Sequence, residues 1–274
     1  MKKKLLAGLA VGLFVMSMAG GVCATTITLS LVDSYQKTKP FGMAYDGENI
    51  WWGANDGVLH EMATNGVDTG NSLSTNRWSA LAWNGSQLVQ AKANTLYFFN
   101  TDGTASTTAT ISGVGSNGLI DGLDYDHGQV WYSPDVGNVY RGDSSIAGFA
   151  GTTVLSGGGG FSGVERVDIG AESFLFTVND ASSPRRLDVR ELDGTLLGQA
   201  TFSNQRYEDL AFDGRYLWAA DFYGNKIDKF DVLSDGSSIL DDNNPVPEPA
   251  TMLLFGTGLA GLVGFSRKRS SKKN

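Results

Sequence analysis

The amino-acid sequence predicts an all-β fold assembled from a repeat. Five segments share one pattern, in which an apolar strand, a polar turn and an aromatic-rich second strand follow one another. Their turns lie at Asp46, Asn84, Asp126, Gly170 and Asp213, with spacings of 38, 42, 44 and 43 residues. Asp-Gly and Asn-Gly pairs between alternating apolar runs are typical of tight hairpins, in which both central residues need a positive φ. Each repeat is therefore predicted to begin with a β-hairpin.

A second turn follows each hairpin about half a repeat later. These turns are Asn65-Gly66, Asp102-Gly103, Gly142-Asp143, Asp193-Gly194 and Asp235-Gly236. Each repeat thus supplies up to four short strands, and four strands in roughly 40 to 50 residues are typical of a β-propeller blade. A β-sandwich does not explain the period, and a right-handed β-helix requires a shorter one.

The number of blades and the closure of the ring follow from the length. Residues 25–240 divide into five repeats of about 43 residues, and a sixth repeat is not found. The last repeat has three strands of its own, at 207–212, 216–221 and 226–232. The alternating stretch at 26–32 lacks a partner in its own repeat, so we expect it to supply the missing outer strand. The predicted fold is a five-bladed propeller closed by its N-terminal strand, which removes two exposed sheet edges.

Residues 1–24 have the order of a secretory signal peptide. Lys2, Lys3 and Lys4 precede an apolar run, and small residues end the segment at Ala24. The apolar run is shorter than the ~20 residues that a membrane span needs, which disfavours an uncleaved anchor. Cleavage after Ala24 removes the single cysteine of the chain, so no disulfide framework is expected.

The C-terminal end also has three parts. Residues 241–249 form a proline-rich linker, residues 250–265 are apolar, and residues 266–274 are basic. The apolar part is predicted to be a short transmembrane helix, and the basic part indicates a cytoplasmic C-terminus. A plain membrane anchor is the alternative interpretation of this pattern.

This tail resembles the PEP-CTERM sorting signal of Gram-negative, exopolysaccharide-producing bacteria. The residues that carry the resemblance, apart from the glycine-bearing apolar run, are Pro247, Glu248, Pro249, Arg267, Lys268 and Arg269. The resemblance covers about the last 30 residues and implies recognition by an exosortase, a membrane transpeptidase or protease. It implies export across the inner membrane, a transient membrane anchor, and then a location at the outer surface or outside the cell.

The net charge of the chain restricts the classes of partner that it can bind. The whole chain has a net charge of −8, but residues 25–245 hold 13 basic and 28 acidic side chains, a net charge of −15. The two basic ends therefore conceal a strongly acidic central domain. Nucleic acid is excluded as a partner, because its phosphates require a basic face.

We expect the functional face to carry the starts of the innermost strands and the loops between second and third strands, since loops on a rigid scaffold usually hold the binding residues. The ligand-face candidates are polar side chains from these loops together with one tryptophan at an inner-strand start. They are Trp78, Asn55, Asp56, Asn94, Asp135, Asn179, Asp180 and Asn225. Trp51 and Trp52 are adjacent and therefore face opposite sides of their strand, so at least one of them is a candidate interface or sugar-stacking residue. Most tryptophans are expected in the core between blades.

Four carboxylates near the inner-strand starts are a tentative calcium site, because Ca²⁺ prefers several oxygen ligands. They are Asp121, Glu165, Glu208 and Asp209. Apart from this ion no cofactor is expected. The alternatives are that Asp and Asn in the loops of this face merely cap turns, or that Arg166 neutralises Glu165 or Asp209. An architectural resemblance to calcium-dependent lactonase propellers rests on fold analogy alone.

The sequence thus favours an exported surface or extracellular-matrix protein that is not an enzyme. It is expected to bind exopolysaccharide or another extracellular protein. A calcium-dependent hydrolase that uses the same face is the alternative function, and a purely structural matrix protein without a pocket is a third interpretation.

Overall fold

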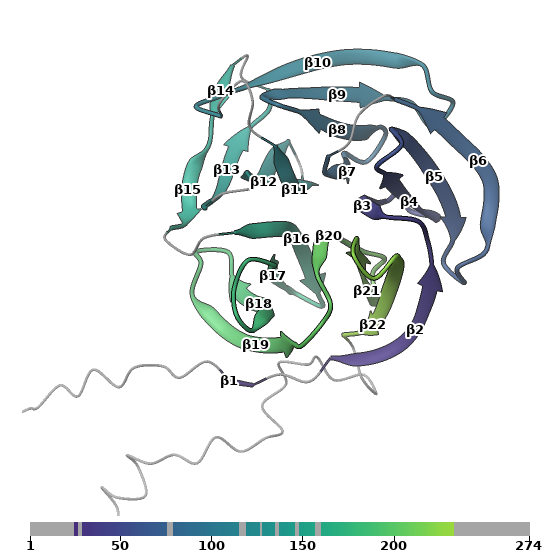
Figure 1. Cartoon of the computed structure of the whole chain (residues 1–274). Helices are drawn as coiled ribbons and strands as arrows, with labels where there is room; N and C mark the ends of the chain where they lie inside the picture. The colour runs from purple at the N-terminus through teal and green to yellow at the C-terminus, as the bar shows by residue number, and fades with distance from the viewer. Residues whose placement is uncertain are drawn as a thin grey trace, which may run out of the picture.

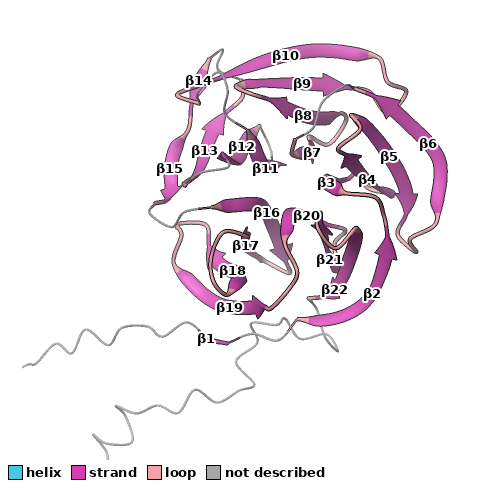
Figure 2. Ribbon diagram, viewed as in Figure 1, coloured by secondary structure: helices cyan, strands magenta, loops and turns pink. Residues whose placement is uncertain are grey.

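The computed structural model describes residues 25–26, 29–75, 79–114, 119–126, 128–134, 137–145, 148–156 and 160–232. In these ranges every regular element is a β-strand, and five sheets surround a common centre (Figures 1 and 2). No helix within the same ranges is long and apolar enough to cross a membrane. The predicted signal peptide and transmembrane segment lie outside the described residues.

Each sheet is one blade, and its strands run in sequence order from the centre outward, apart from the N-terminal strands and one short strand added at an outer edge. The first blade comprises β3 (Pro40–Tyr45), β4 (Asn49–Ala54), β5 (Val58–Ala63) and β6 (Asp68–Ser74). The second comprises β7 (Leu81–Trp83), β8 (Leu88–Lys92), β9 (Thr95–Phe99) and β10 (Ala105–Ser112), with β14 (Phe149–Ala150) added in parallel at the edge. The third comprises β11 (Ile120–Asp126), β12 (Gln129–Pro134), β13 (Val139–Asp143) and β15 (Thr152–Leu155).

The remaining two blades contain the N-terminal strands. The fourth comprises β16 (Phe161–Ile169), β17 (Glu172–Asn179), β18 (Arg185–Glu191) and β19 (Leu196–Phe202), with β1 (Thr25–Thr26) parallel to β19. The fifth comprises β20 (Tyr207–Phe212), β21 (Tyr216–Asp221), β22 (Lys226–Asp231) and, on the outside, β2 (Ser30–Gln36). The predicted five-bladed propeller is therefore confirmed.

An N-terminal strand closes the ring, as predicted, but four residues later than the predicted stretch at 26–32. Strand β2 pairs antiparallel with β22, with Ser30 opposite Asp231. The alternation of apolar residues at 26–32 does not mark a buried face of the strand, because Leu31 and Val32 are 55% and 51% exposed. The position of the strand is set near its end, where the ring of Tyr35 stacks on Trp218 at 5.7 Å.

The hairpin turns lie where the sequence predicts them, but their backbone differs from the expected one. In the turn after β3, Gly47 has φ +100° whereas Asp46 is not among the residues with positive φ. The Asp46 Oδ1 atom instead accepts hydrogen bonds from the amides of Glu48 and Asn49, at 2.9 and 2.7 Å. These two side-chain hydrogen bonds stabilise the turn, so a positive φ at Asp46 is not required. In the second series of turns, the one predicted at Gly142-Asp143 is wrong, since both residues belong to β13.

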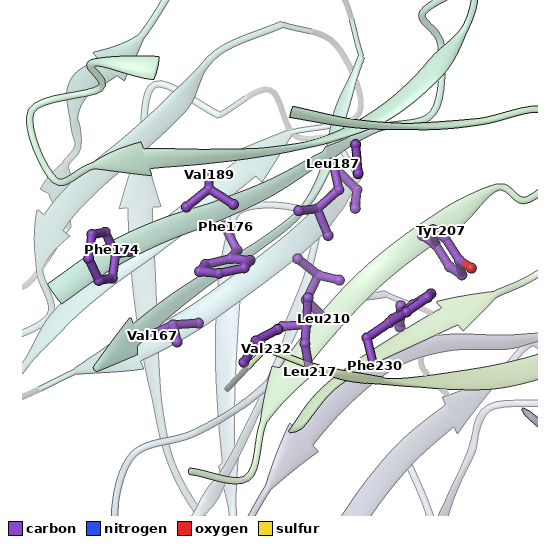
Figure 3. Close-up of a cluster of buried hydrophobic side chains, with 13 residues drawn as sticks. Val167, Phe174, Phe176, Leu187, Val189, Tyr207, Leu210, Leu217, Phe230 and Val232 are labelled. Carbon is purple, nitrogen blue, oxygen red and sulfur yellow. The ribbon is translucent and has the colours of Figure 1, made fainter. Parts of the chain in front are cut away.

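The hydrophobic core consists of five clusters, each between two neighbouring blades. Figure 3 shows the cluster between the fourth and fifth blades, which includes Phe176 of the fourth blade with Leu210 and Leu217 of the fifth. Trp51 packs toward the second blade and Trp52 toward the fifth, so neighbouring residues fill two different clusters, as predicted. Full burial of one such side chain contributes about 1.5–3 kcal/mol. Because every blade shares its core with both neighbours, the ring is stabilised as one unit.

Small residues on the inner strands let the blades approach closely. A Cβ at Gly42 would lie 2.8 Å from the amide nitrogen of Leu81, and one at Gly163 would lie 2.9 Å from the Cα of Asp209. Asp209 occupies the corresponding place on β20. Its side chain is fully buried, and Oδ2 accepts hydrogen bonds from the amides of Met43 and Leu81, at 2.9 and 3.2 Å. One carboxylate therefore links three blades at the centre.

The strand directions define two faces of the ring. The pocket face contains the loops between second and third strands and the connections from one blade to the next. The turn face contains the hairpins after the innermost strands. Because Ser30 pairs with Asp231, the chain enters β2 and leaves β22 at the turn face. The described ring is thus joined to the segments before Ser30 and after Val232 on the same side.

Candidate functional site

A pocket of about 630 Å³ opens on the pocket face between the fourth and fifth blades. Its walls come from the β17–β18 loop, the end of β19 and the start of β20. The lining residues are Asp180, Ala181, Ser182, Ser183, Pro184, Arg185, Phe202, Ser203 and Arg206. The volume lies within the range of roughly 300–1,000 Å³ that is usual for small-molecule sites. This face is the one on which the sequence analysis places the ligand.

Asp180 accepts hydrogen bonds from several residues in and beside the pocket. Its side chain is only 5% exposed. Oδ1 accepts a hydrogen bond from the Ser162 hydroxyl at 2.8 Å, and Oδ2 accepts one from Nε of Arg206. The backbone oxygen of Asp180 accepts a hydrogen bond from Nε of Arg185 at 3.0 Å. One residue thus positions both arginines of the pocket.

The two guanidinium groups are attached by one edge. Arg206 contacts Asp180 and, at 3.4 Å, Oε1 of Glu208, in both cases through Nε. Arg185 also uses Nε. Within the described part of the chain, the terminal nitrogens of both side chains have no hydrogen bond. Since a guanidinium has five N–H donors, four remain on each arginine for a ligand.

The charge of Arg206 is secured by its neighbours. Desolvation lowers the pKa of this guanidinium, but the hydrogen bond and charge of Asp180, with the charge of Glu208, raise it above its ordinary value. Arg206 is therefore a permanent cation with a fixed Nε. The arrangement leaves its terminal nitrogens as charged hydrogen-bond donors in a concave site.

Aromatic side chains border the pocket. The Phe202 ring lines it and packs edge-on against Tyr207 with a centroid distance of 4.9 Å. The guanidinium of Arg206 lies 4.4 Å from the ring centroid of Tyr223, and Tyr223 is 60% exposed. Tyr223 belongs to the β21–β22 loop, so an apolar ring surface from the fifth blade flanks the polar pocket.

Of the ligand-face candidates that the structure describes, Asp180 lines the pocket and Asn179 lies directly before it in the chain. Asn179 is 1% exposed and its Oδ1 accepts the amide hydrogen bond of Ser182 at 2.9 Å, so it shapes the loop and does not face a ligand.

The other candidates lie in separate loops. Asp56 accepts the amide hydrogen bond of Val58 at 2.9 Å beside the exposed Asn55. Asn94 accepts the Thr95 hydroxyl at 3.4 Å, and Asn225 accepts the Lys39 amide at 3.2 Å. Asp56 thus caps its own turn, whereas Asn225 joins two loops that lie far apart in the sequence. Trp78 and Asp135 lie outside the described residues.

Trp51 and Trp52 are unavailable for a ligand. They are 1% and 6% exposed, and the ring of Trp52 stacks on His60 at a centroid distance of 4.5 Å. The expectation that one of them is an interface or sugar-stacking residue is therefore wrong. Among the described residues of the pocket face, Tyr223 has the exposed aromatic ring.

The four carboxylates of the tentative calcium site serve different partners. Within the described ranges, no group of three or more His, Cys, Asp or Glu side chains is arranged to hold a metal ion. Asp209 bonds inner-strand amides, Glu208 lies beside Arg206, and Oε1 of Glu165 accepts the amide hydrogen bond of Phe212 at 2.9 Å. Asp121 is buried near Asp209. Arg166 neutralises neither Glu165 nor Asp209, since it pairs with Asp126 and Asp168 at 2.7 and 2.9 Å.

Carboxylates near the centre titrate abnormally. Burial and the charges of Asp124 and Asp209 raise the pKa of Glu165 well above its usual range. Burial also raises the pKa of Asp209, although the amides that it accepts lower it. Glu165 sits in mid-strand because β16 begins at Phe161, four residues before the predicted start. These groups join neighbouring inner strands, which accounts for their position without a ligand.

The sequence analysis missed the main polar donors of the pocket, Arg185, Arg206 and Ser203. Arg185 begins β18, and the other two lie in the connection between the fourth and fifth blades. The available signal was the scarcity of basic residues in an acidic domain. Two arginines on the predicted functional face are unexpected in such a composition.

The chain carries a PEP-CTERM protein-sorting motif at residues 245–269, as the family comparison shows. The predicted motif residues Pro247, Glu248, Pro249, Arg267, Lys268 and Arg269 all fall in this match. They lie outside the described residues. The motif marks a protein that is exported and sorted by an exosortase.

Solved structures resemble the ring. The crystal structure of Myxococcus xanthus glutaminyl cyclase covers 76% of this chain and 97% of its own, with a TM-score of 0.58 and 12% identity. The propeller domain of Myceliophthora thermophila Cps50 (Swd1) covers 70% and 66%, with a TM-score of 0.43 and 11% identity. A mitotic checkpoint complex covers 69% and 60%, with a TM-score of 0.43 and 13% identity. No curated protein sequence matches the chain.

The protein is thus a five-bladed β-propeller with a C-terminal exosortase sorting motif. At 12% identity, the likeness to the glutaminyl cyclase concerns the fold alone.

Proposed function

We propose that this exported propeller binds an extracellular saccharide in the pocket between its fourth and fifth blades, without catalysis. The observation that carries the proposal is the composition of this pocket. Hydroxyls of Ser183 and Ser203, two arginines and one carboxylate surround a cavity that aromatic rings border. Sugars present hydroxyls to such donors and acceptors and apolar ring faces to aromatic side chains.

The orientation of the ring supports the proposal. The chain joins its two end segments at the turn face, whereas the pocket opens on the opposite face. While the C-terminal segment holds the protein at a membrane, the pocket can therefore face away from that membrane. A saccharide of the cell surface or the surrounding matrix is then accessible to it. The exopolysaccharide of the host is the ligand that we propose, and the outer surface is the location.

The test measures retention of the full-length protein, in mild detergent, on immobilised exopolysaccharide from the host. Ser203→Trp places a large ring in the pocket and should abolish retention. Ser72→Trp is the matched control, because Ser72 is exposed on the outer strand β6 of the first blade. Both variants should melt like the wild type.

Equal retention of the wild type and Ser203→Trp would refute the pocket as the binding site. Absence of retention for the wild type would refute saccharide binding. The other proposal from the sequence, a protein ligand on this face, would then be tested by crosslinking at the cell surface.

A further inference from the structure

We propose that the pocket selects saccharides that carry a carboxylate, such as uronic acids. This inference rests on the proposed function and specifies its ligand class. It starts from the two arginines, whose terminal nitrogens donate no hydrogen bond to any described residue. Neutral sugars do not require two guanidinium groups, whereas a carboxylate matches the planar fork of an arginine with two parallel hydrogen bonds.

The arginines are prepared for this contact before a ligand arrives. Nε of Arg206 is held by the carboxylate of Asp180, and Nε of Arg185 by the backbone oxygen of the same residue. Asp180 is in turn fixed by the Ser162 hydroxyl. Because both guanidinium groups are attached to one buried residue, little side-chain entropy remains to be lost on binding.

The charge balance limits how much negative charge a ligand can bring to the site. Two arginine charges face those of Asp180 and Glu208, which lie behind Nε of Arg206. The site is therefore formally neutral, in a domain with a net charge of −15 between residues 25 and 245. A dianion such as phosphate would be held less well than a carboxylate. The carboxylate can use donors on the open edges without disturbing the ion pair underneath.

Polar and apolar groups near the arginines suit the rest of a sugar ring. The hydroxyls of Ser183 and Ser203 have no hydrogen bond within the described part of the chain, so they can bind ring hydroxyls. Tyr223 presents its ring beside Arg206 and is 60% exposed. The carboxylate would lie at the arginines and the ring face at Tyr223.

The experiment compares matched pairs of oligosaccharides in titration calorimetry with the full-length protein. The probes are hexasaccharides of polygalacturonate and of alginate, each with a carboxyl-reduced counterpart that keeps the chain and loses the charge. Inorganic phosphate serves as the dianion. We expect at least one uronate probe to bind at least about tenfold more tightly than its reduced form, since hydrogen bonds to charged groups contribute about 1.5–3 kcal/mol. The affinity should fall with added salt.

Variants locate the contact. Arg185→Gln should weaken uronate binding about tenfold and leave binding of the reduced form unchanged. Arg206→Gln should act in the same direction, and its melting temperature shows whether Asp180 tolerates the loss of its partner. Arg215→Gln is the control, because Arg215 pairs with Asp231 at 3.1 Å on the turn face. It should not change binding.

The outcomes separate this inference from the proposed function. Equal binding of uronate and reduced probes, or tighter binding of phosphate, would overturn selection for carboxylates and leave saccharide binding intact. Retention on host exopolysaccharide with no affinity for either uronate probe would also overturn the inference alone. An absence of binding to every probe and to the host polymer would overturn both.

Discussion

The carboxylate of Asp209 in the fifth blade accepts the backbone amide hydrogen bond of Met43 in the first blade at 2.9 Å. The same oxygen accepts the amide of Leu81 in the second blade. Glycine occupies the corresponding position on three other inner strands, at Gly42, Gly122 and Gly163. At the three glycines a neighbouring blade lies where a Cβ would stand, whereas on β20 a carboxylate occupies this position and joins the fifth blade to the first and the second.

Asp209→Ala should lower the free energy of unfolding by about 2–4 kcal/mol, because it leaves two buried amides without an acceptor. Asp209→Asn keeps an acceptor oxygen and should remain within about 1 kcal/mol of the wild type. Urea denaturation at pH 7 measures both. Equal losses in the two variants would show that the hydrogen bonds to Met43 and Leu81 are not the reason for the buried carboxylate.

Asp124 should make stability depend on pH. Burial raises the pKa of this carboxyl to about 6, with the nearby charge of Asp126 acting in the same direction. A raised folded-state pKa means that the folded state binds the proton more tightly, so the wild type loses stability as pH rises from about 4 to about 6.

Asp124→Asn removes this titration. Between pH 4 and pH 7, the stability of the variant relative to the wild type should therefore rise by at most about 3 kcal/mol. Urea denaturation of both proteins at the two pH values provides the measurement. A difference that does not vary with pH would contradict the raised pKa.

The extent to which the sequence predicted the fold depends on which features are local. Turn residues such as Asp46 and Asp213 act within their own hairpins, so their spacing predicted the five blades and the strands of the last one. The edges of the ring depend on partners far along the chain. Strand β2 was misplaced because its position is set by the contact of Tyr35 with Trp218.

The sequence predicted the face of the ring on which the pocket lies, but not the pocket itself. The rule for blade order places the β17–β18 loop there, which is why Asp180 was a candidate. Arg185 and Arg206 join the site because both contact Asp180, a relationship between separate loops that no local pattern encodes. The central carboxylates were mistaken for metal ligands for a related reason. Their acceptor role depends on amides of neighbouring blades, as for Glu165 and Phe212.

Tyr35 should be the key residue of the closing strand. Tyr35→Ala removes the ring that stacks on Trp218 and should cost about 2 kcal/mol of stability. Leu31→Ala on the same strand is the control, because Leu31 is 55% exposed, and should change stability by less than about 0.5 kcal/mol. Thermal and urea unfolding measure both. A larger effect at Leu31 would mean that the closure depends on its outer face.

Two tryptophans at equivalent places should differ in their tolerance of substitution. Nε1 of Trp51 donates a hydrogen bond to Oδ2 of Asp46 at 2.8 Å, five residues earlier. Trp131 stands five residues after Asp126, but its Nε1 is buried without a hydrogen bond in the described structure. Trp51→Phe should therefore cost about 1 kcal/mol more than Trp131→Phe in urea denaturation. The reverse order would show that packing, and not the indole hydrogen bond, decides the cost.

Processing of the tail should not affect the pocket. Replacement of Pro247, Glu248 and Pro249 by alanine disrupts the sorting motif, so the full-length chain should persist in a strain with an intact exosortase, whereas the wild type is shortened. The ring joins the tail after Val232 at the turn face, and the pocket opens on the other face. Both forms should therefore bind host exopolysaccharide with the same affinity, within about twofold.

Immunoblots of pulse-labelled cells follow the processing, and retention assays compare the two forms. A wild type that stays full-length would contradict sorting by the exosortase, whereas weaker binding by the uncleaved form would place the tail close to the pocket.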